Sequence, residues 1–424
     1  MATKAKDVAE LCAAAHAAAP HVAASARPVR DGALEAIAAG LEACSAEILE
    51  ANEADLEAGR EAGLTDALLD RLALDPGRIE AIAAGAGAVA ALDDPVGELL
   101  EERVLPNGLE LRKVRVPLGV VAVVYEARPN VTIDSAALCL KAGNAVVLRG
   151  SASAARTNEV LARIAAEGVA SAGLPPEAVT LVGGGDRAEL AELATQERTV
   201  DLIIPRGGEG LKKALEGVAT VPVIYAAAGN CHVYVDASAD LEMAAAIAVN
   251  AKVQRPGVCN AAETLLVHRG IAADFLPLVA GRLVEAGVEI RADERGLAAI
   301  GPGLADQARP VAQEDWATEF LAPILAVGVV DSLDEAVAHI ARFGSRHSEA
   351  IVTGDPDSAR RFELEVDAAC VYVNASTRFT DGGEFGMGAE IGNSTQKLHV
   401  RGPIGLRELC TYKYLVRGDG QIRE

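Results

Sequence analysis

Apolar residues recur at helical spacing in the first part of the chain. Leu34, Ile37 and Leu41 fall on one face of a helix, and glutamates occupy positions between such residues. Asp75 followed by Pro76 is typical of a helix start, because Asp caps the first N–H groups and Pro fits the first helical position. This pattern predicts a run of helices through residues 1–93.

From residue 120 onward, short apolar runs alternate with helical patterns, which predicts parallel, doubly wound sheets. The chain is therefore expected to contain two α/β domains. In the first domain, strands are expected at residues 120–125, 145–148, 178–182, 201–204 and 223–225, and helices at 135–142 and 157–167. In the second domain, strands are expected at residues 264–267, 323–330, 350–353 and 370–373, and helices at 334–341 and 357–361.

An Asn-Gly dipeptide at residues 107–108 separates two alternating runs, residues 102–105 and 109–116. Asn-Gly between such runs predicts a β-hairpin, because both residues tolerate positive φ. A two-stranded ribbon is only marginally stable in water, so we expect it to lie against another element or a second subunit. Residues 409–416 also alternate, and they predict an edge strand.

The composition excludes several classes of protein. The 424 residues are too many for one core, so two or three domains are expected. Because 50% of the residues are hydrophobic, these domains can bury large cores. A formal charge of −22 without a basic cluster argues against binding to nucleic acid or to an anionic membrane. The 7 cysteines are unpatterned, which indicates reduced thiols in a cytoplasm, and no Cys/His spacing predicts a metal site. No apolar run of about 18 residues predicts a membrane span, so a soluble cytoplasmic protein is expected.

Cys259 is the cysteine whose context best fits a nucleophile. It follows a helix-breaking turn at residues 254–257, and the polar Asn260 and Glu263 come after it. Such a turn exposes the thiol, and Arg255 with nearby backbone N–H groups can hold it as the reactive thiolate. The alternative is a small buried hydrophobe, the usual role of a free cysteine.

Polar turns follow several of the predicted strands, where a parallel sheet binds its ligands. They include residues 149–151, 183–186 and 206–208. The glycines at 183–185 resemble a phosphate-binding loop at a helix start, but they lack the G-x-G-x-x-G spacing of an ordinary dinucleotide site. The alternative for the glycines at 207–208 is a plain tight turn.

Several segments resemble the aldehyde dehydrogenase superfamily. Residues 117–124 and 141–148 resemble its first cofactor-domain strands, and Glu319 to Pro323 resembles the Glu-x-x-x-Pro segment that holds the nicotinamide ribose. A closer match, over nearly the whole chain, is to the γ-glutamyl phosphate reductase family within it. The segments that carry this match are residues 125–132, 229–236, 371–385, 394–403 and 412–423.

The resemblance implies a fold and a division into domains. The implied fold is α/β and aldehyde dehydrogenase-like, with two doubly wound α/β domains and a small β-ribbon. Residues 1–99 and 117–250 are expected to bind the cofactor, and residues 251–396 to form the catalytic domain. Residues 100–116 and 397–424 are expected to form an oligomerisation ribbon, because superfamily members place this ribbon between subunits. A homodimer or higher oligomer is therefore expected.

The family also implies a reaction. In proline biosynthesis, its members use NADPH to reduce L-glutamyl 5-phosphate to L-glutamate 5-semialdehyde, and phosphate is released. Cys259 occupies the family's nucleophile position, so it is expected to carry a thioester. Asn130 matches the asparagine that stabilises the oxyanion, and its alternative role is that of a turn residue. No kinase-like segment precedes the reductase region, so a transient contact with a separate glutamate 5-kinase is the further partner considered.

A different function, NAD-dependent hydrolytic oxidation of a small aldehyde, stays open as the alternative. Hydrolytic aldehyde dehydrogenases carry a Glu before a Gly-Gly pair, and this Glu activates water against the thioester. The corresponding run, residues 224–230, contains no carboxylate, which favours the reductase. A catalytically silent scaffold is the third alternative, and the presence of Cys259, Asn130 and Glu319 argues against it.

The substrate that the resemblance implies carries a phosphate, an α-carboxylate and an α-ammonium group. Arg128, Arg255 and Arg378 lie in the motif turns and are expected to bind the anionic groups, because guanidinium binds them as a planar fork. For each arginine the alternative is a structural ion pair. Asn250 and Asn260 are expected to take polar contacts.

The resemblance places the cofactor NADPH against both domains. Arg149 and Ser151 follow the strand where the superfamily binds the adenosine ribose, and Arg149 is expected to contact the 2′-phosphate. The full set of expected cofactor contacts is Arg149, Ser151, Gly207, Gly208, Glu319 and Pro323.

Overall fold

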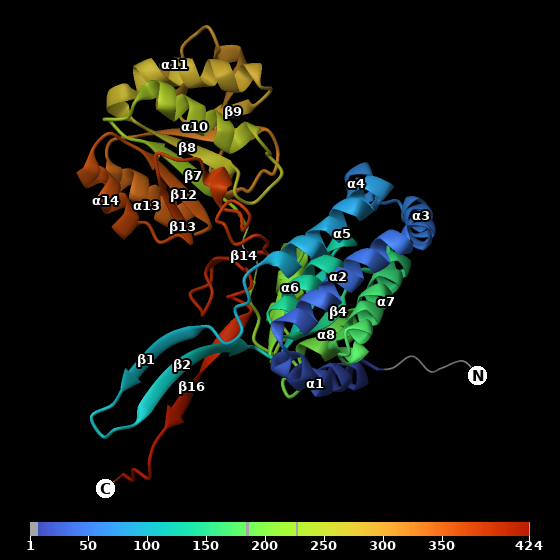
Figure 1. Cartoon of the computed structure of the whole chain (residues 1–424). Helices are drawn as coiled ribbons and strands as arrows, with labels where there is room; N and C mark the ends of the chain where they lie inside the picture. Colours follow the sequence, from blue (N-terminus) through green and yellow to red (C-terminus); the bar gives the residue numbers. More distant parts are fainter. Residues whose placement is uncertain (1–6, 184–185, 226–227, 424) are drawn as a thin grey trace. The chain divides into compact units, whose positions relative to one another are not determined.

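The computed structural model describes residues 7–183, 186–225 and 228–423 (Figure 1). Its residue contacts divide the chain into two units. Unit 1 comprises Met1–Ala226, Met387–Gly392 and Ile404–Glu424, and unit 2 comprises Ala227–Gly386 and Asn393–Pro403. This boundary differs from the expected one after residue 250, because helix α10 (Leu241–Val253) packs on strands of unit 2.

Unit 1 begins with a series of helices, as the apolar periodicity predicted. Asp75 caps one of them through its side chain, and Pro76 takes the first helical position. Leu34, Ile37 and Leu41 are fully buried on one helix face. The helices of this series are α1 (Val8–Ala24), α2 (Arg27–Ala43), α3 (Ser45–Glu61), α4 (Asp66–Leu72) and α5 (Pro76–Ala91).

A four-stranded parallel sheet of order β5-β4-β3-β6 forms the core of unit 1. Its strands β3 and β4 are buried along their whole length, which explains their unbroken apolar sequences. The strands are β3 (Val120–Tyr125), β4 (Ala145–Arg149), β5 (Val179–Leu181) and β6 (Leu202–Arg206). The helices that connect or follow them are α6 (Asn130–Lys141), α7 (Ala155–Ser171), α8 (Arg187–Ala194) and α9 (Glu209–Glu216), with short 3-10 turns at Ala152–Ala154 and Pro176–Ala178.

Two sequence-based expectations for unit 1 are wrong in detail. The strand expected at residues 223–225 is reduced to an isolated bridge between Val223 and Ile203. Pro222 precedes it and has no N–H for a ladder, which limits the pairing. Helix α6 begins at Asn130 rather than at residue 135, so Asn130 is a helical residue and not a turn residue.

Unit 2 contains a seven-stranded parallel sheet of order β10-β9-β11-β8-β7-β12-β13. Its strands are β7 (Cys231–Val235), β8 (Ala262–His268), β9 (Glu289–Ala292), β10 (Ala308–Pro310), β11 (Ile324–Val330), β12 (Ser348–Val352) and β13 (Cys370–Val373). The short strands β9 and β10 were not expected from the sequence. A small antiparallel pair, β14 (Asn393–Ser394) and β15 (Gly402–Pro403), also belongs to this unit.

Helices cover both faces of the unit 2 sheet (Figure 1). Val233 and Leu265 lie in the apolar core on the side of α10 and α11, whereas the neighbouring Tyr234 and Leu266 lie in the core on the side of α13 and α14. Successive side chains of a strand point to opposite faces, so a doubly covered sheet carries apolar residues at most strand positions. The helices are α10, α11 (Arg269–Glu285), α12 (Glu294–Ile300), α13 (Leu333–Phe343) and α14 (Pro356–Glu365), with 3-10 turns at Ala305–Gln307, Asp315–Ala317 and Thr377–Phe379.

The predicted hairpin is present and is joined by the predicted edge strand. β1 (Leu99–Val104), β2 (Glu110–Pro117) and β16 (Cys410–Arg417) form an antiparallel sheet with β2 in the centre. Most of this sheet is exposed, and Tyr412 and Tyr414 retain 49% and 52% of their accessible surface. The fold class predicted from the sequence, with doubly wound sheets and a β-ribbon, is confirmed.

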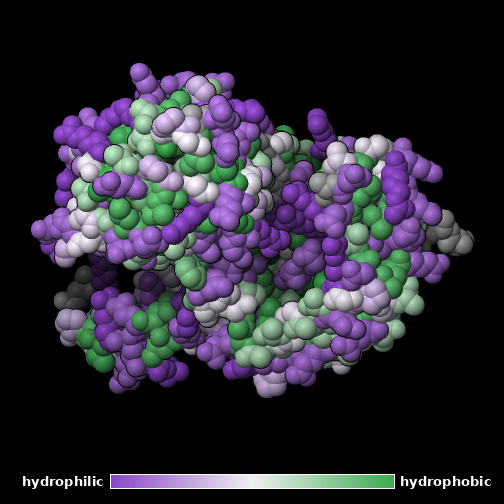
Figure 2. Space-filling view, turned by 90° about the horizontal axis from the view of Figure 1, so that it is seen from above, coloured by the Kyte–Doolittle hydropathy of each residue, from purple (hydrophilic) through white to green (hydrophobic). Residues whose placement is uncertain are grey.

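Hydrophilic residues predominate on the face of the molecule that Figure 2 shows, with smaller hydrophobic patches between them. This distribution agrees with the large negative charge and with cores built chiefly from Ala, Val, Leu and Ile. Among the described residues, no helix is long and apolar enough to cross a membrane.

Candidate active site

Cys259 lies between the end of α10 at Val253 and the start of β8 at Ala262. Its side chain is half-buried, whereas Cys12, Cys139, Cys231, Cys370 and Cys410 are buried. Burial raises the pKa of Cys12 to about 11 and that of Cys410 to about 12, and it also raises the pKa of Cys139 and Cys231. The thiols of Cys12, Cys139, Cys231 and Cys410 therefore stay protonated near neutral pH, which makes them poor nucleophiles.

Gly229 packs directly on the backbone of Cys259. A Cβ atom at residue 229 would lie 1.6 Å from the carbonyl oxygen of Cys259, so only glycine fits. The Gly229 N–H donates to Oε1 of Glu319 at 2.6 Å, and the Cys231 thiol donates to the Cys259 carbonyl at 3.2 Å. The structure thus brings two of the expected site residues, Cys259 and Glu319, into contact with one glycine.

The segment from Glu319 to Pro323 is tied to the strand that follows Cys259. The Leu321 N–H donates to Oε1 of Glu263 at 3.2 Å, and Leu321 has a φ of 52°, in the left-handed region. Oε2 of Glu263 accepts a hydrogen bond from Lys252 Nζ at 2.5 Å. The expected cofactor residues Glu319 and Pro323 therefore lie in a segment that the body of unit 2 holds in place.

The buried pair of Lys252 and Glu263 was not expected from the sequence. Both side chains have no exposed surface. Burial raises the pKa of Glu263 to about 7 and lowers the pKa of Lys252, while the charge of each residue opposes the effect on the other. Loss of one partner would leave an uncompensated buried charge, which is strongly destabilising.

Arg378 lies along the turn that carries Cys259. Its Nε donates to Oε1 of Gln254 at 2.8 Å, and its terminal guanidinium nitrogen donates to Oδ1 of Asn260. Burial lowers the pKa of Arg378, and so does the charge of Arg255. Arg378 and Asn260 thus lie against the turn that carries Cys259, and the charge of the neighbouring Arg255 acts on Arg378.

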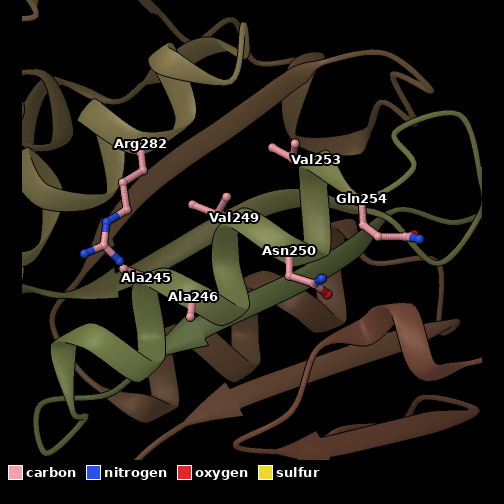
Figure 3. Close-up of a pocket in the computed structure, with 7 residues that line it drawn as sticks. All are labelled: Ala245, Ala246, Val249, Asn250, Val253, Gln254 and Arg282. Atoms are coloured by element: carbon pink, nitrogen blue, oxygen red, sulfur yellow. The ribbon is translucent and has the colours of Figure 1, made fainter.

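Asn250 lies elsewhere on α10. It is exposed and lines a shallow hollow on the helix surface with Ala246, Val249 and Arg282 (Figure 3). Ala245, Val253 and Gln254 complete the lining. Within the described part of the chain, its side chain makes no hydrogen bond to the residues around Cys259. The substrate role expected for Asn250 therefore gains no support from this arrangement.

In unit 1, Asn130 begins α6, and its Nδ2 donates to Oδ2 of Asp134 at 2.8 Å. Burial raises the pKa of Asp134, and the hydrogen bond from Asn130 opposes this shift. The carboxylate fixes the amide with its nitrogen toward the first turn of the helix. Arg128 is exposed in the turn that precedes α6.

The expected adenosine-side residues lie at the carboxyl ends of the unit 1 strands. Arg149 ends β4 and donates to the backbone oxygen of Asp186 at 2.7 Å. The Ser151 hydroxyl accepts from the Ala127 N–H at 3.2 Å. The glycines expected at 183–185 form a segment of which 184 and 185 lie outside the described residues, as do 226 and 227 of the run 224–230.

The turn after β6 offers its backbone N–H groups to a carboxylate. The Gly208 N–H donates to Oε2 of Glu126 at 3.2 Å, and a Cβ on Gly207 would lie 2.7 Å from the same oxygen. An ideal Cβ on Gly208 would meet nothing within 4 Å, so open space adjoins the turn. The Gly208 N–H is therefore already occupied by the Glu126 carboxylate.

Comparison with known proteins agrees with this architecture. The model of the aldehyde dehydrogenase family matches residues 1–314 and 280–390. The γ-glutamyl phosphate reductase of Heliobacterium modesticaldum is 55% identical over 93% of this chain and 94% of its own, and that of Thermobifida fusca is 52% identical over 99% of both. The crystal structure of γ-glutamyl phosphate reductase from Thermotoga maritima superposes with a TM-score of 0.96 at 43% identity, covering 99% of this chain and 100% of that one.

These matches span the chain, including both units and the ribbon. The chain therefore belongs to the aldehyde dehydrogenase family and, within it, to the γ-glutamyl phosphate reductases. The resemblance stated from the sequence is confirmed. Membership makes the protein an oxidoreductase that uses a nicotinamide cofactor.

Proposed function

We propose that the protein reduces L-glutamyl 5-phosphate to L-glutamate 5-semialdehyde with NADPH and releases phosphate, as a step of proline biosynthesis. The observation that carries the proposal is the half-buried Cys259, whose backbone packs on Gly229 and whose neighbours Gln254 and Asn260 hold Arg378. The names of the relatives, at 52% to 55% identity, favour this reaction over hydrolytic oxidation of an aldehyde.

The chain supplies the nucleophile for this reaction. The Cys259 thiolate attacks the acyl carbon, the electron pair of the C–O bond leaves with phosphate, and a thioester to Sγ forms. The cofactor, when bound, supplies the hydride that reduces this thioester. The resulting thiohemiacetal collapses to the aldehyde and restores the thiolate.

Two additions to the acyl carbon place negative charge on its oxygen. The Asn130 amide and the Cys259 N–H are the proposed donors to this oxyanion. Removal of one such donor typically slows an enzyme by about 10²–10³-fold. The sequence 224–230 contains no carboxylate, so the base that hydrolytic aldehyde dehydrogenases carry there to activate water is missing.

The proposed cofactor contacts come from residues of both units. In unit 1, Arg149 and Ser151 would bind the adenosine ribose and the 2′-phosphate, and Gly207 and Gly208 would bind the phosphates. In unit 2, Glu319 and Pro323 would hold the nicotinamide ribose. A preference for NADPH over NADH is part of this proposal, and Arg149 is its most direct support, because it is a guanidinium at the end of β4.

The proposal extends to assembly and location. We expect a cytoplasmic homodimer or higher oligomer in which residues 100–116 and 397–424 form the contact, supported by the exposed tyrosines of β16. Residues 251–396 would form the catalytic part. A transient contact with glutamate 5-kinase stays a prediction.

The decisive experiment is oxidation of glutamate 5-semialdehyde in the reverse direction. NADP⁺ reduction should require inorganic phosphate and should exceed NAD⁺ reduction, and Cys259→Ser should abolish it. The matched control is Cys44→Ser, because Cys44 is the other half-buried cysteine among the described residues. Aldehyde oxidation that proceeds with NAD⁺ in the absence of phosphate would instead support the hydrolytic alternative.

A further inference from the structure

Arg378 is held at two points by residues that flank the nucleophile in the sequence. Gln254 accepts from its Nε at 2.8 Å, and Asn260 accepts from a terminal nitrogen of the guanidinium. Gln254 and Asn260 stand on either side of Cys259 in the chain. The plane of the guanidinium is therefore fixed against the turn that presents the thiol.

Asn260 is committed to holding this arrangement. It is buried, and its Nδ2 donates to the backbone oxygens of Thr380 at 2.9 Å and of Arg378 at 3.3 Å. Its own backbone oxygen accepts from the Thr377 hydroxyl at 2.7 Å. Because both amide hydrogens point to carbonyls, Oδ1 must face Arg378. The Asn260 side chain therefore positions Arg378.

A second arginine, Arg255, carries a positive charge that acts on Arg378. Arg255 is exposed and follows Gln254 directly, and its charge lowers the pKa of Arg378 after the larger effect of burial. In the described part of the chain, neither guanidinium has a carboxylate within ion-pair distance. Asp381, Cys259 and Cys231 act in the opposite sense and raise the pKa of Arg378. Because the two positive charges repel each other, an anion that binds between them lowers the free energy.

We propose that Arg255 and Arg378 form the subsite for the phosphate group of the acyl phosphate, with Gln254 and Asn260 positioning Arg378. This inference rests on the proposed function and assigns one of its ligand groups. The phosphate is bonded through oxygen to the carbon that Cys259 attacks, whereas the α-carboxylate lies at the far end of the glutamyl chain. A cation pair beside the thiol therefore meets the phosphate first, and a planar fork suits its oxygens.

The same pair assists the reaction in two ways. It stabilises the Cys259 thiolate before the substrate binds, and it neutralises the charge that the departing phosphate gains when the C–O bond breaks. In the reverse direction it binds inorganic phosphate for attack on the thioester. In the forward reaction the subsite thus favours an acyl phosphate over an ester. In the reverse reaction it favours phosphate over water as the group that attacks the thioester.

The test measures the KM for inorganic phosphate in the reverse reaction, with glutamate 5-semialdehyde and NADP⁺ saturating. Arg255→Gln and Arg378→Lys should each raise this KM about tenfold or more, because each removes or distorts a charge-assisted contact. The KM for the aldehyde should stay within about twofold of that of the unmodified protein. Arg342→Gln is the control, since Arg342 is an exposed arginine on α13.

Asn260→Ala should raise the KM for phosphate in the same direction, although residue 260 touches no phosphate. A second readout does not need turnover: inorganic phosphate should slow alkylation of Cys259 by iodoacetamide, and Arg255→Gln should remove this protection. Arg255 is exposed, so this variant stays informative even where Arg378→Lys fails to fold.

Two results separate the possible failures. If the aldehyde KM rises in both arginine variants while the phosphate KM is unchanged, the pair binds the α-carboxylate and the subsite assignment is wrong. If the unmodified protein oxidises the aldehyde without phosphate, the proposed function itself is wrong, whatever the arginines bind.

Discussion

The Cα of Gly229 faces the carbonyl of Cys259 so closely that a Cβ on residue 229 would lie 1.6 Å from that oxygen and 2.5 Å from the Cys259 Cα. The obstacle is backbone, which cannot rotate away as a side chain can. The same glycine donates its N–H to Glu319. The position of the nucleophile and that of the proposed ribose-binding carboxylate therefore depend on one residue without a side chain.

Gly229→Ala should consequently reduce catalytic activity by more than any loss of stability of the sheets would explain. A displacement of the turn by about 1 Å typically costs about 10²-fold in rate. We expect a loss of about this size in kcat/KM, with slower alkylation of Cys259. Gly281→Ala in α11 is the matched control, because a Cβ there meets nothing within 4 Å and alanine favours a helix. Equal activity of the two variants would contradict the packing argument.

Glu319→Gln should slow hydride transfer more than acylation. The neutral amide can still meet the Gly229 N–H, but it binds ribose hydroxyls more weakly than a carboxylate does. Rapid-quench measurement of phosphate release should show a preserved burst followed by slow NADPH oxidation. A lost burst together with unchanged hydride transfer would remove Glu319 from the proposed role.

Stability should fall in mild acid because of His347. This residue is fully buried, its Nδ1 shares a hydrogen bond with the Ser348 hydroxyl at 2.8 Å, and burial lowers its pKa from 6.5 to about 4. Below pH 6.5 the unfolded chain binds a proton that the folded chain refuses. The contribution of neutral His347 to the free energy of unfolding is therefore complete above pH 6.5. It is lost as the pH falls toward 4, by about 1.4 kcal/mol per pH unit.

Urea unfolding at about pH 7 and pH 5 measures this effect. His347→Gln should lower stability at pH 7 and flatten its dependence on pH, since glutamine does not titrate. The exposed His16→Gln in α1 serves as control and should leave the slope unchanged. An identical slope in His347→Gln and the unmodified protein would show that His347 does not titrate as described.

Deletion of residues 409–424 should convert the assembled protein to monomers with weakened activity. It removes β16, whose Tyr412 and Tyr414 are exposed, with Lys113 Nζ lying 3.7 Å from the centre of the Tyr412 ring. It also frees the edge of β2, which leads through β3 toward Asn130. Light scattering at micromolar concentration is the measurement, and a monomer mass for the full-length protein would refute the prediction.

Short sequence patterns were enough to predict the elements whose structure depends only on residues close together in the chain. The Asn-Gly at 107–108 predicted the hairpin, Asp75 with Pro76 predicted a helix start, and unbroken apolar runs predicted buried strands such as β3 and β4. Pro256 and Gly257 interrupt the helical pattern just before Cys259 and made it the candidate nucleophile, a role that stays a prediction. In each case the relevant interactions are made within a few residues, so the pattern carries the answer.

Tertiary structure alone decided which distant residues meet. The short strands β9 and β10 have too few residues for a period and exist because neighbouring strands supply their hydrogen bonds. The run at 223–225 forms only one bridge, because Pro222 before it has no N–H for a ladder. The pairing of Lys252 with Glu263 and the clamp of Asn260 on Arg378 join residues 11 and 118 positions apart. A hydrogen bond between such groups depends on how the packed elements orient them, and the sequence pattern of either partner does not contain that orientation.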